Sequence, residues 1–203
     1  HLGDGFDGLA ASTDDAHLIL AGLTPVALRQ RFTLAHELGH LLAGDDQEIH
    51  TDEDIYSSSS RRGDTEVRAN NFAAAFLMPE AALRAAVVAG FDREAFATLA
   101  MDLMVSPRAL AIRLESLRLI DGIKKNQWGS IPSAEAARAS QLQERLADVT
   151  AYATEPRRPG LLTRDLFTAY IDEKTTLRPY AQLVGVDSTT LRDELERPAE
   201  RQG

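Results

Sequence analysis

The stretch of sequence that decides the fold reads Arg31-Phe32-Thr33-Leu34-Ala35-His36-Glu37-Leu38-Gly39-His40-Leu41-Leu42. On a helix, the four-residue spacing of His36 and His40 places both imidazoles on one face, about 40° and 6 Å apart. Two neutral imidazoles held in this way suit Zn²⁺, which binds histidine nitrogen at about 2.0–2.1 Å. Glu37 lies one step round the helix, where a general base can take a proton from an attacking water. The pattern therefore predicts a metal site with an adjacent base.

The residues around this motif predict a long amphipathic helix that begins near Pro25. Apolar side chains recur at intervals of three and four residues and form one stripe. The stripe consists of Leu28, Phe32, Ala35, Leu38 and Leu42. Gly44 is typical of a helix end. Because Gly39 destabilises a helix interior by about 1 kcal/mol relative to alanine, we expect another element to approach the helix closely there.

A catalytic zinc ion needs a third protein ligand and one open coordination position. The next predicted helix carries Glu66, which lies 26 residues beyond His40. Asn70 follows one turn later on the same face, where its side chain can accept the second N–H of a metal-binding histidine, His36 in our interpretation. Spacing favours Glu66 as the third ligand without deciding it. Four rival residues remain open for this role, namely Asp64, Glu48, His50 and Asp52.

The composition limits what else the chain can contain. Its 203 residues include no cysteine, which excludes disulfides, thiol catalysis and cysteine-ligated zinc. The net charge of −9 argues against a broad nucleic-acid-binding surface. No apolar stretch approaches the roughly 20 residues of a membrane span, so we expect no membrane contact. A chain without cysteine fits the cytoplasm, which is the predicted location. No signal peptide is visible, but the sequence begins at His1 rather than Met, and we expect a segment upstream of it.

The remaining pattern predicts a small sheet followed by helices. Residues 8–12 and 17–21 are expected to form two strands joined by a polar turn. One helix is expected from Ser133 to about Tyr152, a linker over residues 155–160, and two or three short helices within 163–196. The expected fold class is α+β, mostly helical, with a helical C-terminal extension. Further helix starts are expected near Asp64, Pro79, Asp92, Ser106, Pro179 and Ser188.

Two helix pairs, at residues 99–117 and 178–195, have the spacing of a helix-turn-helix unit. The second pair carries Asp193, Glu194 and Glu196, which would repel phosphate groups. For the first pair, packing beneath the core explains the same apolar spacing. We therefore expect no direct nucleic-acid binding. The C-terminal helices are assigned to packing, dimerisation or substrate docking, which leaves a homo-oligomer open.

Two segments together resemble the ImmA/IrrE family of zinc metallopeptidases. The first is residues 31–42, quoted above. The second is similar to the family signature E-x-x-A-N-x-F-A-x-x-x-L-M-P. It reads Glu66-Val67-Arg68-Ala69-Asn70-Asn71-Phe72-Ala73-Ala74-Ala75-Phe76-Leu77-Met78-Pro79. Val105-Ser106 and Arg113-Leu114 also resemble the family's following helices, so the resemblance covers roughly residues 5–122.

The resemblance implies a zincin-like core, in which a small sheet packs against the active-site helix. It implies His36, His40 and Glu66 as ligands of one zinc ion per chain, Glu37 as the catalytic base, and Asn70 as the partner of a ligand histidine. The expected division is a zincin-like ImmA/IrrE-type metallopeptidase domain over residues 1–126, a helix and linker over 127–160, and a small helical region over 161–203.

The resemblance also implies a regulatory zinc endopeptidase. Family members are cytoplasmic bacterial or phage proteins that cleave helix-turn-helix repressors and so release stress or mobile-element genes. The expected partner is therefore such a repressor, and the strand at residues 17–21 is expected to align it. An electrophile should stabilise the oxyanion, and His50, Tyr56 and His17 each remain candidates. The alternative is a regulatory binding module that keeps the zincin fold but sequesters its partner without cutting it.

Overall fold

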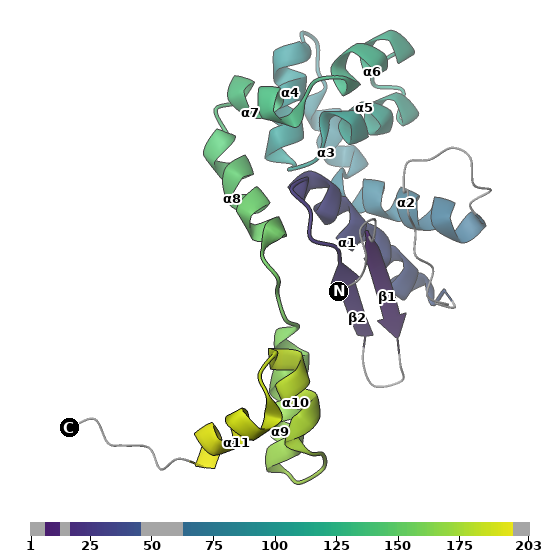
Figure 1. The fold of residues 1–203 in the computed structure, drawn as a ribbon. Helices are drawn as coiled ribbons and strands as arrows, with labels where there is room; N and C mark the ends of the chain where they lie inside the picture. Colours follow the sequence, from purple (N-terminus) through teal and green to yellow (C-terminus); the bar gives the residue numbers. More distant parts are fainter. Residues whose placement is uncertain (1–6, 13–16, 46–62, 197–203) are drawn as a thin grey trace. The chain divides into compact units, whose positions relative to one another are not determined.

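The computed structural model divides the chain into two compact units, His1–Glu155 and Pro156–Gly203 (Figure 1). The first unit is larger than the predicted domain of residues 1–126, because α7 (Ser133–Ala139) packs against α4 (Arg93–Asp102) and α6 (Gly122–Gly129) runs across position 126. The division falls at the start of the proline- and arginine-rich stretch 155–160. The structure describes residues 7–12, 17–45 and 63–196.

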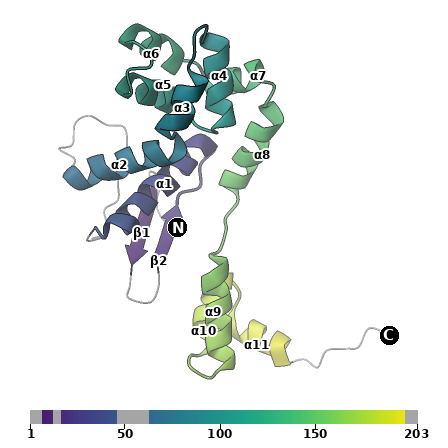
Figure 2. The same cartoon turned by 180° about the vertical axis from the view of Figure 1, so that it is seen from behind.

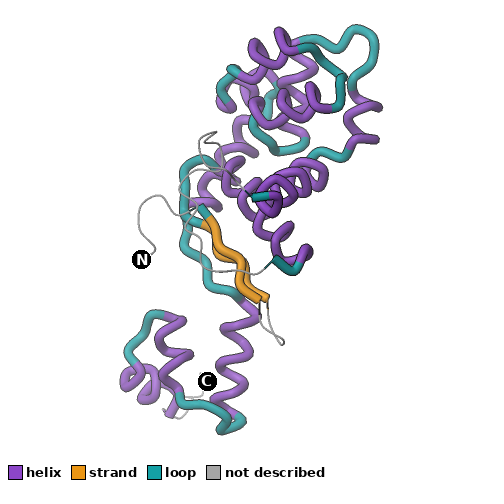
Figure 3. The backbone as a smooth tube through the Cα atoms, turned by 90° about the vertical axis from the view of Figure 1, so that its right-hand side faces the viewer, coloured by secondary structure: helices purple, strands orange, loops and turns teal. Residues whose placement is uncertain are grey.

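A two-stranded antiparallel hairpin opens the first unit. β1 (Gly8–Ser12) pairs with β2 (His17–Ala21), with Gly8 opposite Ala21 and Ser12 opposite His17. Both strands have the predicted bounds. Gly8 and Ala10 are buried on the face that packs against α1, whereas Ser12 is exposed. Figure 3 draws the two strands of this hairpin in orange.

The histidine motif lies on α1 (Ala27–Ala43), as predicted. The helix ends at Gly44, whose φ of 66° suits glycine and whose N–H donates to the carbonyl of Leu41 at 3.2 Å. The predicted apolar stripe is buried at Leu28 and Ala35. The prediction is wrong at Leu42, whose side chain is 68% exposed because no described element covers the last turn of the helix on that side.

α2 (Asp64–Leu77) crosses α1 at very short range. A Cβ atom on Gly39 would lie 3.0 Å from Cδ1 of Phe72 and 3.3 Å from Cα of Ala69. The close approach predicted from Gly39 is therefore confirmed, and α2 is the element that makes it. Ala69 and Ala73 are fully buried at this crossing, where their small side chains let the two helices meet.

The helices α3 (Glu80–Ala86), α4, α5 (Pro107–Ser116), α6 and α7 gather beyond α1 and α2, on the side away from the hairpin (Figures 1 and 2). Two predicted starts are confirmed by side-chain caps. Asp92 accepts the N–H of Glu94 at 3.1 Å, and Ser106 accepts the N–H of Ala109 at 3.1 Å. The large buried side chains of this core include Phe96, Leu83, Met101, Leu110, Leu114 and Trp128.

The predicted single helix from Ser133 to about Tyr152 is wrong, because the chain forms α7 and then α8 (Gln143–Thr154). Gln141 between them has a left-handed φ of 59°, and the N–H of Leu142 donates to the carbonyl of Ala137 at 2.9 Å. This is the hydrogen-bonding pattern that closes a helix end. The sequence offers no glycine here to signal it.

The first helix pair, α4 and α5, is bent by 107°. On α5, Leu110, Ala111 and Leu114 are fully buried, and the helix packs against α6. Packing thus accounts for the apolar spacing of this pair, while the absence of nucleic-acid binding stays a prediction. In the described part of the chain no single helix is long and apolar enough to cross a membrane, although this bent pair passes the test by length and composition.

The second unit consists of three short helices, α9 (Gly160–Ile171), α10 (Leu177–Val184) and α11 (Ser188–Glu196). Its small core contains the buried Leu177 and Ala181. The ring of Phe167 lies 5.1 Å from that of Tyr180, measured between centroids. This part of the chain carries none of the residues singled out for chemistry.

Candidate metal centre

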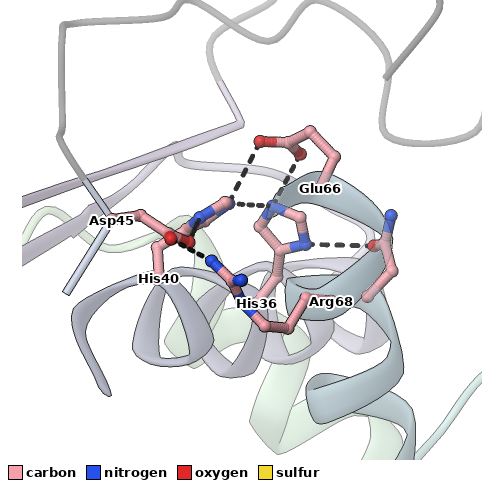
Figure 4. A network of polar contacts seen from close by, with 6 residues as sticks. His36, His40, Asp45, Glu66 and Arg68 are labelled. Carbon is pink, nitrogen blue, oxygen red and sulfur yellow. Dashed lines mark hydrogen bonds and ion pairs between the residues drawn. The ribbon is translucent and has the colours of Figure 1, made fainter. Parts of the chain in front are cut away.

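Side chains from two helices converge on one point. His36 and His40 project from successive turns of α1, and Glu66 from the first turn of α2 (Figure 4). The Nε2 atom of His36 lies 3.2 Å from Oε2 of Glu66, and Nε2 of His40 lies 3.2 Å from Oε1. The two Nε2 atoms are 3.0 Å apart. These three residues form a group that can hold a metal ion.

Of the four rival residues for the third ligand, the structure describes Asp64. It is exposed at the start of α2 and does not belong to the group. Glu48, His50 and Asp52 lie outside the described residues. The close crossing at Gly39 brings the backbones of α1 and α2 together beside the histidine motif. Glu66 on α2 therefore lies next to the two histidines.

The Nδ1 atom of His36 lies 3.0 Å from Oδ1 of Asn70, which is the pairing expected from the sequence. An amide oxygen only accepts a hydrogen bond, so Nδ1 of His36 carries a hydrogen. His36 is only 2% exposed, and its ring is held by packing as well as by Asn70. Its Nε2 atom therefore faces the group.

The partner of His40 was missed by the sequence reasoning. Nδ1 of His40 lies 2.9 Å from Oδ2 of Asp45, and the guanidinium of Arg68 pairs with the other oxygen of Asp45. Asp45 directly follows Gly44, and in the sequence it reads only as part of a helix stop. The usable signal was its position, since a carboxylate just beyond a ligand-bearing helix can turn back to the last histidine.

The donor set fits a metal ion. Both Nδ1 atoms carry hydrogens toward Asn70 and Asp45, so in the neutral imidazoles both Nε2 atoms present lone pairs toward Glu66. Oε2 of Glu66 is buried and accepts no hydrogen bond within the described chain. Lone pairs so close repel unless a cation lies between them. Tetrahedral zinc with bonds of about 2.0–2.1 Å would set its ligands about 3.3 Å apart, close to the separations seen here.

Without a metal ion, a proton on the imidazole of His40 supplies the positive charge beside Glu66. The hydrogen bond to Glu66 raises the pKa of His40 to about 9, against the effect of burial and with help from the carboxylates of Asp45 and Glu37. The close contacts of its carboxylate with the imidazoles of His36 and then His40 hold the pKa of Glu66 well below its usual range. Protons and metal ions therefore compete for this site.

Glu37 lies beside the group without belonging to it. It is half-buried beneath β1, where a Cβ atom on Gly8 would lie 2.8 Å from its Oε1 and 2.5 Å from Cγ2 of Thr33. Its charge acts on the pKa of His40, which places the carboxylate near the histidines. This is the relation that a general base would have to the ligands.

Of the three oxyanion candidates, the structure describes His17, and it does not bring His17 to this group. His17 is exposed and hydrogen-bonded to Oγ of Ser12 at 2.6 Å. Ser12 lies four residues from Gly8, or about 13 Å along the strand, and Gly8 is the residue of β1 that lies against Glu37. His50 and Tyr56 lie outside the described residues.

The helix-borne histidine pair and the glutamate from the next helix define a metallopeptidase-like domain. Residues 26–115 match the family model of the IrrE N-terminal-like domain (Peptidase_M78), in agreement with the resemblance to the ImmA/IrrE family. The segment carries all five residues predicted for the site. No curated protein and no solved structure matches the chain. The α+β, mostly helical class is as predicted, and a zincin-like core stays a prediction.

Proposed function

We propose that this chain is a zinc-dependent endopeptidase, with His36, His40 and Glu66 as the ligands of one zinc ion. The observation that carries the proposal is the convergence of two Nε2 atoms and a buried carboxylate oxygen that accepts no hydrogen bond in the described chain. The family match over residues 26–115 supports a peptidase over a structural metal site.

A bound zinc ion would act as a Lewis acid that polarises the peptide carbonyl and makes water easier to deprotonate. Glu37 accepts the proton of the attacking water and passes it to the nitrogen of the leaving amine. Asn70 and Asp45 hold the hydrogens on the two Nδ1 atoms, so that both Nε2 atoms remain free to bind the ion.

The substrate we propose is a helix-turn-helix transcriptional repressor in the cytoplasm, whose cleavage releases stress or mobile-element genes. Its scissile segment would add as an extra strand to the hairpin. We favour β1 for this role over β2, the strand expected from the sequence, because Gly8 of β1 lies against Glu37. Figures 1 and 2 also draw β1 on the side of the hairpin that faces α2.

The test is to incubate the zinc-loaded protein with helix-turn-helix repressors of its source organism and to identify the products by mass spectrometry. We expect one specific cut by the wild type and none by Glu37→Gln, which keeps the ligands. A repressor that stays intact in a stable complex with the wild type would contradict the peptidase and favour the non-cleaving binding module.

A further inference from the structure

The carboxylate of Asp45 connects the two helices that carry the metal-binding group (Figure 4). One oxygen accepts the hydrogen of Nδ1 of His40 at 2.9 Å, and the other pairs with Arg68. Arg68 lies on α2, two residues beyond Glu66, whereas Asp45 directly follows the Gly44 cap of α1. The carboxylate is 11% exposed, so both oxygens are committed in a largely buried place.

We propose that Asp45 is a positioning residue for the metal site and that Arg68 positions Asp45. This inference rests on the proposed zinc site. Asp45 fixes the hydrogen on Nδ1 of His40 and turns Nε2 of that ring toward His36 and Glu66. Because a carboxylate is a stronger acceptor than an amide, Asp45 also holds the ring of His40 more firmly than Asn70 holds that of His36.

The two histidines depend unequally on their partners. His36 is 2% exposed and is held by its surroundings as well as by the neutral amide of Asn70. His40 is 12% exposed and lies in the last turns of α1, where fewer neighbours restrain its ring. Removing Asp45 should therefore weaken metal binding more than removing the side chain of Asn70.

A purely structural role for the Asp45 side chain is small by comparison. The helix cap itself uses the backbone, since the N–H of Asp45 donates to the carbonyl of His40 at 3.3 Å whatever the side chain. The only further contribution of the Asp45 side chain to folding that we identify is its ion pair with Arg68. Because the side chain of Arg68 is 53% exposed, this pair stabilises the fold only weakly. Folding and metal positioning can thus be separated by experiment.

The experiment compares zinc affinity, measured by chelator competition, with the visible absorption spectrum of the cobalt-substituted protein. The variants are Asp45→Ala, Asp45→Asn, Arg68→Ala and Asn70→Ala. Glu80→Ala is the matched control, because it removes a comparable exposed ion pair with Arg84, away from the site. Circular dichroism of the metal-free variants checks the fold.

We expect Asp45→Ala to weaken zinc binding by about 10–100-fold and to alter the cobalt spectrum. Arg68→Ala and Asn70→Ala should weaken binding less, and Glu80→Ala should bind as the wild type does. Asp45→Asn keeps the size and an acceptor oxygen, so it should fold and bind severalfold more weakly even if the alanine variant does not fold.

Wild-type affinity and a wild-type cobalt spectrum in the folded Asp45 variants would overturn the inference while leaving the zinc site intact. A wild-type protein that binds no zinc would instead overturn the proposed function, and the inference with it.

Discussion

The substitution Gly39→Ala tests whether the site depends on the close crossing of α1 and α2. The new Cβ atom would lie 3.0 Å from Cδ1 of Phe72 and 3.3 Å from Cα of Ala69. The phenylalanine ring can turn aside, but the backbone at Ala69 cannot, so α2 must move by a few tenths of an ångström. Glu66 moves with α2, whereas both histidines stay on α1.

Two effects on stability oppose each other in this variant. Alanine favours the helix by about 1 kcal/mol relative to glycine. Overpacking at the crossing costs about 1–3 kcal/mol. We expect the metal-free protein to lose at most about 2 kcal/mol of unfolding free energy. Zinc affinity should fall by about tenfold or more, because a displacement of a few tenths of an ångström exceeds the roughly 0.2 Å tolerance of a metal site.

The assay is chelator competition for zinc together with denaturant unfolding of the metal-free protein. Gly122→Ala is the matched control, since that glycine also lies in a helix but its Cβ would meet only Glu115 Oε1, at 3.6 Å. If Gly39→Ala bound zinc as tightly as the wild type and gained the stability expected from helix propensity alone, the structural reasoning would be refuted.

Zinc binding near neutral pH should release about one proton per ion, because the pKa of His40 is about 9 without metal; calorimetry in buffers of different ionisation enthalpy would detect it, and no release would contradict it. Because the pKa of His40 is raised from 6.5 to about 9, protonated His40 stabilises the metal-free protein fully below about pH 6.5, and this stability is lost as the pH rises through 9. An unfolding midpoint that does not fall between these pH values would contradict the raised pKa. Glu37→Gln should keep zinc affinity within about twofold yet slow cleavage by about 10²-fold or more in a peptide assay, and cleavage at the wild-type rate would exclude Glu37 as the base. Gly8→Ala should destabilise the fold by about 1–3 kcal/mol in denaturant unfolding, because its Cβ would lie 2.5 Å from Thr33; unchanged stability would show that β1 can shift freely.

Features encoded by local signals could be predicted from the sequence. The strand bounds followed from alternation and turn residues, and the starts of α4 and α5 from the capping side chains Asp92 and Ser106. The pairing of His36 with His40 is helix geometry alone. Gly39 also indicated a close neighbour. Spacing favoured Glu66 on the helix that provides it, and the family signature pointed to the same residue.

Features set by left-handed backbone or by tertiary contact could not be predicted in the same way. The turn of Asp45 back onto His40 depends on the left-handed Gly44 and on Arg68 from another helix. The break between α7 and α8 depends on Gln141, a residue with no strong turn preference. Leu42 continues an apolar stripe that the structure leaves exposed, because periodicity identifies a face without saying what covers it.

The most direct test of the central claim is the zinc stoichiometry of the metal-stripped protein, measured in parallel on a His36→Ala variant. We expect close to one tightly bound zinc ion per chain in the wild type and loss of that binding in the variant. Absence of specific binding in the wild type, or equal binding by His36→Ala, would contradict it.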